Sequence, residues 1–387
     1  MAKMNQEPKD NGIAIVLTGG GARAAYQVGF LRCLAKIVPE ARFSIITGVS
    51  AGAINAVYLA NHPGSIEDAA EGLTNLWWDL EIDDVFCTSP TAIAKTGFGW
   101  LVNLISGGAR LAPQPQGFVD TQPLRKFLSN ALDSDGDGKV SGIRSNITSG
   151  HLKALALTTL NYSTGQTVTW IQGSNLQDWE RPYRRSRQTE IGIEHLMASA
   201  AIPLFFPAVR IGNSWFGDGG VRLTAPLSPA LHLGAKRILA ISTRYPRTIE
   251  EADIPVVEGY PPPAQVLGNL ANSVFLDLLD QDVERARKVN QLLVKLAPED
   301  RDGMEMLDIR VLRPSEDLGK LAAEYESKLP KTFRFMSRGL GTRKTSSPDS
   351  ISLVMFQPDY LRHLIRLGEQ DAQAQKDKLA AFFRWVA

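Results

Sequence analysis

The sequence predicts a three-layer α/β sandwich, with helices on both faces of a mainly parallel central sheet. Two short apolar runs, 12–17 and 43–47, end in glycine-containing turns and have the composition of buried strands. The first is followed by a segment with apolar residues at helical spacing, 22–37, and the second by a short helical segment, 53–60. A strand–helix–strand–helix order is typical of parallel sheets whose faces are covered by helices.

Further elements of both kinds follow along the chain. We expect strands at 152–160, 167–171 and 237–242, a helix at 189–201, a tight turn at 215–220, and long helical segments at 265–296 and 358–386. A proline-rich stretch, 254–263, separates the last strand from the long helical segments.

These elements divide the chain into three parts. We expect a flexible N-terminus at 1–11, an α/β domain at 12–245, and a mainly helical C-terminal region at 246–387 that packs on the core. Within the α/β domain, residues 83–119 break into glycine, proline and scattered aromatic residues, which indicates a cap over the domain.

The composition is that of a globular protein, since 44% of the 387 residues are hydrophobic and 21% are charged. The net charge of +1 argues against nucleic acid as a partner, because such binding depends on many cationic contacts to phosphates. Cys33 and Cys87 have neither metal-ligand nor disulfide-framework spacing. The sequence has no signal peptide and no apolar run long enough to span a bilayer. We therefore expect a cytoplasmic protein whose membrane contact is at most peripheral. The sequence does not determine the oligomeric state.

A nucleophile elbow is predicted at Gly48-Val-Ser50-Ala-Gly52, between a strand and a helix. Such a sharp turn strains the backbone of its serine, and side chains at Gly48 or Gly52 would collide with the flanking strand and helix. The turn exposes the Ser50 hydroxyl beside the positive end of a helix. Ser50 is therefore the candidate nucleophile.

A second glycine-rich turn, 19–23 (Gly-Gly-Gly-Ala-Arg), follows the first strand. Glycines at the mouth of a helix leave backbone N–H groups bare, which suits a developing oxyanion, and Arg23 adds a positive charge. This turn also fits the dinucleotide fingerprint, which needs a carboxylate at the end of the next strand. The sequence there is Thr-Gly-Val-Ser at 47–50, so we favour the oxyanion site.

A third element, Asp218-Gly219-Gly220, is a turn that lets a carboxylate approach another backbone closely. Together with the two earlier turns and with 198–207 (Ala-Ser-Ala-Ala-Ile-Pro-Leu-Phe-Phe-Pro), it makes the sequence resemble the patatin-like phospholipase family. The resemblance covers roughly residues 12–242.

The resemblance implies a patatin-like fold for the catalytic domain at 12–245 and a Ser–Asp dyad, with Ser50 as nucleophile and Asp218 as base. It implies hydrolysis of carboxylic esters of glycerolipids through an acyl-serine intermediate, with no cofactor. The residues implied for the oxyanion hole are Gly19, Gly20, Gly21 and Arg23.

Two other functions fit parts of the pattern. A Ser–His–Asp esterase of the α/β-hydrolase type would place its histidine after the acid, at His232 or His363. A lipid-binding or regulatory protein would keep the pocket without turnover.

A partial calcium loop occurs at 133–138, where Asp133, Asp135, Asp137 and Gly138 match the first half of that motif. Its twelfth position is Arg144 in place of the bidentate glutamate, so we favour a solvated turn over a metal site.

Two segments have the composition to meet a lipid surface. One is a basic run with an aromatic residue, made up of Arg181, Tyr183, Arg184, Arg185 and Arg187. The other is 92–105, which either dips into a membrane interface or packs on the core; its large apolar residues are Phe98, Trp100, Leu101, Leu104 and Ile105.

Overall fold

The structure of the chain is a computed structural model that describes residues 12–107, 116–257, 259–275, 278–345, 347 and 349–384. The expected flexible terminus at 1–11 and the middle of the expected cap, 108–115, lie outside these residues.

The centre of the described chain is one sheet of ten strands, and its longest run of neighbours is parallel. The strand order is β10-β9-β1-β2-β3-β4-β6-β5, and β8 pairs with β3 and with β7. The strands are β1 (Ile13–Leu17), β2 (Ile45–Val49), β3 (Ala154–Asn161), β4 (Thr167–Gly173), β5 (Glu180–Arg181), β6 (Arg184–Gln188), β7 (Val209–Ile211), β8 (Ser214–Asp218), β9 (Arg237–Ile241) and β10 (Asp308–Leu312).

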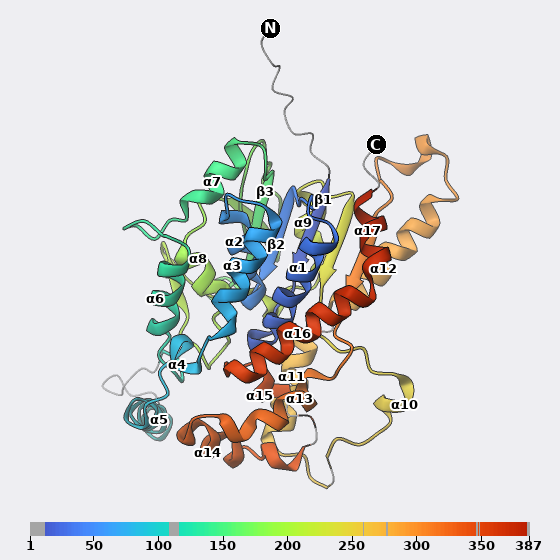
Figure 1. The fold of residues 1–387 in the computed structure, drawn as a ribbon. Coiled ribbons are helices and arrows are strands. Elements are labelled where there is room, and N and C mark those ends of the chain that lie inside the picture. The colour runs from blue at the N-terminus through green and yellow to red at the C-terminus, as the bar shows by residue number, and fades with distance from the viewer. Residues whose placement is uncertain are drawn as a thin grey trace.

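Both faces of the sheet are covered, which confirms the predicted three-layer sandwich (Figure 1). Alternate residues of β1 enter different cores, since Ile15 and Leu17 belong to one and Ala14 and Val16 to the other. The helices of the first core include α1 (Ala25–Ile37), α2 (Ala51–Asn61), α3 (Ile66–Trp78) and α16 (Pro358–Ala374). Those of the second include α9 (Ser228–His232) and α12 (Leu278–Leu293).

The remaining helices lie around this sandwich. They are α4 (Ile82–Val85), α5 (Pro90–Ile105), α6 (Gln122–Ala131), α7 (Ser141–Thr148), α8 (Ile193–Ser199), α10 (Ile249–Ala252), α11 (Pro263–Phe275), α13 (Leu318–Tyr325), α14 (Lys331–Gly339), α15 (Asp349–Ser352) and α17 (Lys376–Arg384). Short 3₁₀ turns are η1 (Gly21–Ala24), η2 (Gly219–Arg222), η3 (Pro298–Arg301), η4 (Glu326–Lys328) and η5 (Thr342–Lys344). Within the described residues, no helix combines the length and apolar character needed to cross a membrane.

The C-terminal region is mainly helical and packs on the core, and it also extends the sheet. Helix α16 packs along α1 and places Leu361, Leu364 and Ile365 in the main core. Strand β10 pairs in parallel with β9, so the sheet continues past the domain boundary expected at residue 245. The two parts therefore share one core and one sheet.

Several local expectations differ from the structure. The expected turn at 215–220 is largely β8, and the helix expected at 189–201 begins only at Ile193. The basic run at 181–187 forms β5 and β6 at one edge of the sheet, where charged side chains discourage pairing with another chain. The expected cap contains α5, which Ser89 caps through its side chain and Pro90 begins.

Candidate active site

Ser50 occupies the sharp turn between β2 and α2, as the elbow motif predicts. Its backbone lies at φ 56° and ψ −136°, so the expected strain is confirmed. A Cβ at Gly48 would lie 2.6 Å from the carbonyl oxygen of Gly52, and one at Gly52 would lie 2.4 Å from that of Leu17. Both glycines are thus required by close approach of the flanking chain. The turn leaves the Ser50 side chain at the carboxyl end of the sheet.

Strand pairing places Asp218 beside the turn at Ser50. One edge of β3 is occupied from Ala154 to Leu160 by β4. Strand β2 pairs with β3 up to Thr158, and β8 pairs from Thr159 onward, so both must share the other edge. Val49 lies opposite Thr158 and Asp218 opposite Thr159, which puts Asp218 where the chain leaves β2 at Ser50.

The Asp218 carboxylate is fully buried and only partly satisfied. Its Oδ1 accepts a hydrogen bond from the amide of Gly220 at 2.8 Å, and Oδ2 has no hydrogen-bond partner among the described residues. Burial raises the pKa of Asp218 to about 7, while the nearby Ser50 hydroxyl and the Gly220 amide oppose that rise. The Ser50 hydroxyl thus faces the carboxylate without forming a hydrogen bond of normal geometry. Such looseness is common in ligand-free active sites.

Ser199, at the end of α8, fastens the two candidate residues to the same strand. Its Oγ accepts from the amide of Ser50 at 3.0 Å and donates to the Thr158 carbonyl at 2.8 Å. Two residues later, the Ala201 carbonyl accepts from the amide of Asp218 at 3.0 Å. The motif at 198–207 contains this serine, but the sequence analysis gave it no role.

The glycine turn after β1 lies against the same site. Among the described residues, no acceptor takes the amides of Gly20 and Gly21, whereas the Gly19 carbonyl accepts from Thr243 Oγ1 at 2.7 Å. The amide of Ala22 donates to the Leu353 carbonyl at 2.9 Å, and a Cβ at Gly21 would lie 1.9 Å from that oxygen. A segment of the C-terminal region therefore packs directly on this turn.

Arg23, in η1 of the glycine turn, is paired with residues of the C-terminal region. Its guanidinium is buried and donates from Nε to Ser352 Oγ at 2.7 Å, and from Nη2 to the Asp349 carboxylate. Side-chain exposure of this ion pair is 4% and 10%. Arg23 thereby fastens the glycine turn to α15. Its expected assistance to the oxyanion site stays a prediction, now for an arginine whose charge is paired with Asp349.

A buried amide network holds the helices after both turns together. Asn55 donates to the Ala24 carbonyl at 3.2 Å and to Gln27 Oε1 at 3.0 Å, and it accepts from Trp77 Nε1 at 2.9 Å. Gln27 in turn donates to the Thr18 carbonyl at 2.8 Å. The elbow and the glycine turn are thereby fixed relative to each other, which favours preorganised donors.

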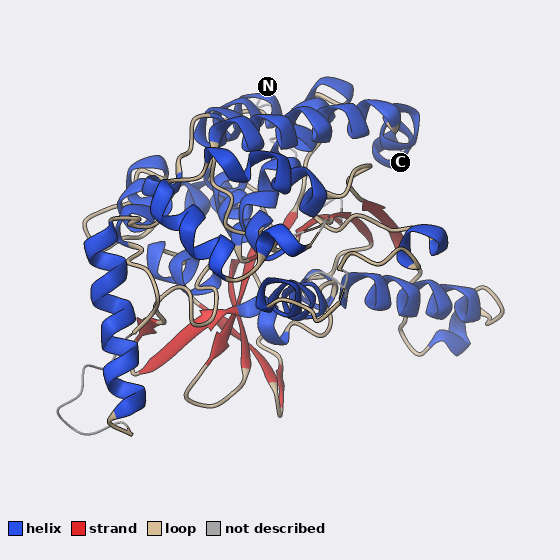
Figure 2. Cartoon of the chain, turned by 90° about the horizontal axis from the view of Figure 1, so that it is seen from below, coloured by secondary structure: helices blue, strands red, loops and turns tan. Residues whose placement is uncertain are grey.

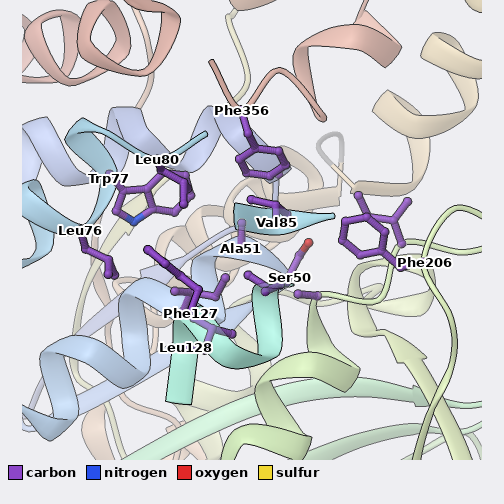
Figure 3. A pocket seen from close by; sticks show the side chains of 15 residues that line it. Ser50, Ala51, Leu76, Trp77, Leu80, Val85, Phe127, Leu128, Phe206 and Phe356 are labelled. Carbon is purple, nitrogen blue, oxygen red and sulfur yellow. The ribbon is translucent and has the colours of Figure 1, made fainter. Parts of the chain in front are cut away.

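An apolar cavity opens from Ser50 into the helical layer (Figure 3). The cavity is narrow in this ligand-free state, with about 30 Å³ open to the centre of a water-sized sphere. Ser50 and Gly21 supply its polar end, and Phe356 closes it from the C-terminal region. The other lining residues are Ala51, Ile54, Leu76, Trp77, Leu80, Val85, Leu124, Phe127, Leu128, Ala200, Ile202 and Phe206.

The histidines lie elsewhere. His232 Nδ1 is 2.8 Å from the Ser228 carbonyl, and His363 Nδ1 is 3.0 Å from the Tyr325 hydroxyl. Burial lowers the pKa of His195 to about 4, and its Nδ1 accepts from the Gly192 amide at 3.1 Å. His62 and His151 line a separate groove near residues 40 and 65. None of the five lines the cavity at Ser50 in the part of the chain that the structure describes.

The partial calcium loop is a turn stabilised by its own carboxylate. Asp135 Oδ1 accepts from the amides of Asp137 at 3.0 Å and Lys139 at 2.8 Å. Across the described ranges, no three His, Cys, Asp or Glu side chains come together as a metal-binding group, so Asp133, Asp135 and Asp137 do not assemble as one. Calcium binding at this turn stays a question for experiment.

Comparison with known proteins identifies the family from which this geometry comes. The chain matches the patatin-like phospholipase family over residues 15–231, more than half of its length. It belongs to that family. The match includes Ser50, Asp218 and the glycine turn, whereas Asp349 and Phe356 lie beyond it.

Solved structures show more distant likeness. Human GIVD cytosolic phospholipase A2 is 12% identical, with a TM-score of 0.46, and the alignment covers 98% of this chain and 61% of that one. VipD from Legionella pneumophila is 12% identical, with a TM-score of 0.37, covering 96% and 67%. The type III effector ExoU is 13% identical, with a TM-score of 0.33, covering 97% and 54%. This chain thus spans about three fifths of the human enzyme. Curated protein sequences gave no match.

Proposed function

We propose that this patatin-like protein is a lipid acyl hydrolase that cleaves carboxylic esters of glycerolipids with a Ser50–Asp218 dyad. The observation that carries the proposal is a strained serine facing a buried, partly unsatisfied carboxylate at the polar end of an apolar cavity. The chemistry of the cavity wall matches an acyl chain, because aliphatic and aromatic side chains line it and it ends at Ser50; the narrow space would have to widen as the chain enters. No metal or other cofactor takes part in the proposed chemistry.

In the first half of the proposed reaction, Ser50 Oγ attacks the ester carbonyl carbon while Asp218 takes the hydroxyl proton. The carbonyl oxygen becomes an oxyanion, which the Gly20 and Gly21 amides stabilise, with Gly19 setting the turn. The ester C–O bond then breaks, and the departing alcohol takes the proton from Asp218. An acyl group remains on Ser50.

In the second half, water attacks the acyl-serine and gives its proton to Asp218. The same amides stabilise the second oxyanion. Collapse releases the fatty acid and returns the proton to Ser50. Asp218 suits this work because its raised pKa, about 7, brings its basicity close to neutral pH.

The experiment combines serine labelling with turnover of a water-soluble ester and of a phospholipid. Ser50→Ala should lose fluorophosphonate labelling and all turnover, and Asp218→Asn should lower kcat by about 10⁴-fold. His232→Ala and His363→Ala serve as controls and should keep most of the activity. Circular dichroism checks that each variant is folded.

Two outcomes would contradict the proposal. Loss of activity in a folded histidine variant would favour a Ser–His–Asp triad, whose members fail together. A wild-type protein that binds lipid but shows neither labelling nor turnover would instead be a lipid-binding protein.

A further inference from the structure

Helix α5 exposes its large apolar side chains instead of burying them. Phe98 is 66% exposed, Leu101 52%, Leu104 73% and Ile105 78%. Of its 16 residues, Ile93 and Gly99 are buried. Of the two roles that the sequence left open for 92–105, this arrangement does not fit packing on the core. A continuous apolar helix on the surface indicates a contact with another apolar phase.

Helix α14 adds one exposed aromatic ring and positive charge. Phe335 is 80% exposed, while Phe333 on the same helix is buried. Between Lys331 and Lys344 five residues are basic and none is acidic, and α5 carries a single charge, Lys95. In a chain with 42 basic and 41 acidic residues, this local excess stands out. Glu326 pairs with Arg338, whereas Lys331, Arg343 and Lys344 are exposed and form no ion pair with a described residue.

Aromatic rings connect α14 to the cavity wall, and α5 lies near α14 (Figure 1). The Phe333 ring is 5.7 Å from that of Phe86, which lies 5.8 Å from Phe206 of the cavity wall. Leu204, two residues before Phe206, is 75% exposed. Figure 1 shows α4, α5 and α14 grouped at the end of the molecule opposite the N-terminus. In Figure 2, which looks at that end, α5 projects as the long helix at the left.

We propose that α5, α14 and the exposed Leu204 form a docking surface for a bilayer that contains anionic phospholipids. Phe98, Leu101, Leu104, Ile105 and Phe335 would enter the acyl boundary, and Lys95, Lys331, Arg343 and Lys344 would meet the headgroups. A second copy of the chain fits this surface poorly, because pairing it with itself would bring like charges together. The purpose of this surface would be to bring the acyl chain of a membrane lipid to Ser50, and that purpose rests on the proposed lipid hydrolysis. Binding to the bilayer does not depend on hydrolysis.

Vesicle binding of the Ser50→Ala protein tests this surface without any turnover. Flotation with phosphatidylcholine vesicles is compared with flotation after addition of phosphatidylglycerol. We expect strong binding only to the anionic vesicles. Leu104→Asp with Ile105→Asp should weaken it by about 100-fold or more, and Lys331→Gln with Lys344→Gln by about 25-fold.

A matched control lies at the end of α12, on another side of the molecule (Figure 1). Leu292 and Val294 are 60% and 65% exposed there, so Leu292→Asp with Val294→Asp should leave vesicle binding unchanged. In the otherwise wild-type enzyme, all these variants should keep their turnover of a water-soluble ester, because their residues do not line the cavity.

Three results would overturn the docking surface: equal binding to neutral and anionic vesicles, equal loss in the α12 control, or α5 variants that bind normally but change a dimer into a monomer on size-exclusion chromatography with light scattering. None of these depends on catalysis. Absence of turnover in the wild-type protein with normal vesicle binding would instead remove the proposed function and leave the surface.

Discussion

The motif-bearing part of the chain and the C-terminal region both reach the site at Ser50, and they do so by different means. Residues up to Asp218 contribute the strained turn, the amides of the glycine turn, the two dyad side chains proposed above and most of the cavity wall. The C-terminal region contributes one carbonyl at Leu353 and the side chains of Asp349, Ser352 and Phe356. The proposed chemistry therefore depends on the motif-bearing part, while the C-terminal region fastens the glycine turn and adds one side of the cavity.

The largest effect on activity should come from pH, through the protonation of Asp218 in the motif-bearing part. If Asp218 is the base, kcat/KM for a water-soluble ester should fall about tenfold per pH unit as the pH drops below about 7. The reason is that burial favours the protonated carboxyl, which cannot accept the serine proton. Steady-state rates between pH 5 and 9 check this. A pH–rate profile with its midpoint near pH 4 would show that burial does not raise the pKa of the base.

The same carboxyl should make stability depend on pH. Its pKa is raised from 3.8 to about 7 in the folded state, so its contribution is present below about pH 4 and is lost as the pH rises through 7. Asp218→Asn cannot ionise, so its Tm should exceed that of the wild type increasingly from pH 4 to pH 8. Calorimetry at several pH values measures this difference.

The next effect should come from the C-terminal region. Asp349→Asn leaves Arg23 as a buried, unpaired cation, which should cost about 3–5 kcal/mol of stability. Because the pair holds the glycine turn, kcat should fall about tenfold with little change in KM, as expected for a donor used in the transition state. Steady-state kinetics with thermal unfolding separates the two effects.

Asp359 provides the matched control for that change. It pairs with Lys328 in the same region, but its side chain is 45% exposed. Asp359→Asn should leave both Tm and kcat nearly unchanged, because an exposed ion pair contributes little to stability. An Asp349→Asn enzyme with normal kcat would show that the buried pair contributes stability without positioning the turn.

A smaller effect is expected at Phe356, which closes the cavity. Phe356→Ala should raise kcat/KM for long-chain esters relative to short-chain esters by about tenfold, because the wall recedes from the acyl chain. A series of nitrophenyl esters measures the ratio. Phe335→Ala, at an exposed ring outside the cavity, should leave it unchanged. An unaltered preference in the Phe356 variant would place the acyl chain elsewhere.

The smallest effect is expected at the partial calcium loop. Asp135→Ala removes an acceptor for two amides of its own turn, which should cost about 1 kcal/mol. Chelator and added calcium should change neither stability nor turnover. A calcium-dependent rise in Tm that Asp135→Ala abolishes would restore the metal site.

The first strands and turns could be predicted because their causes are local. Gly48 is needed because of residues in the helix that follows it, and the strain at Ser50 follows from the turn itself; Gly52 is needed because β1 passes close by, and its place in the elbow motif still revealed it. Strand β6 was missed because Arg184, Arg185 and Arg187 have no strand pattern, and pairing with β4 decides their conformation. Strand β8 is short and contains glycine, so only its partners β3 and β7 reveal it.

The contacts of Arg23 could not be predicted for a related reason. A buried arginine needs a partner, yet nothing near Asp349 or Ser352 in the sequence marks them as that partner. Ser199 is different, because it lies inside the motif at 198–207 that the sequence analysis had already singled out. A polar residue in an otherwise apolar motif was a signal that could have been followed.

The link between Arg23 and Ser352 also has a consequence for the order of synthesis. The two residues are 329 positions apart. At about 5–20 residues per second, a ribosome needs roughly 15–65 s to travel that distance. Until then the glycine turn lacks α15, and the cavity lacks Phe356. A nascent chain therefore carries Ser50 for the time needed to add about 300 residues before the residues that complete the site around it have been made.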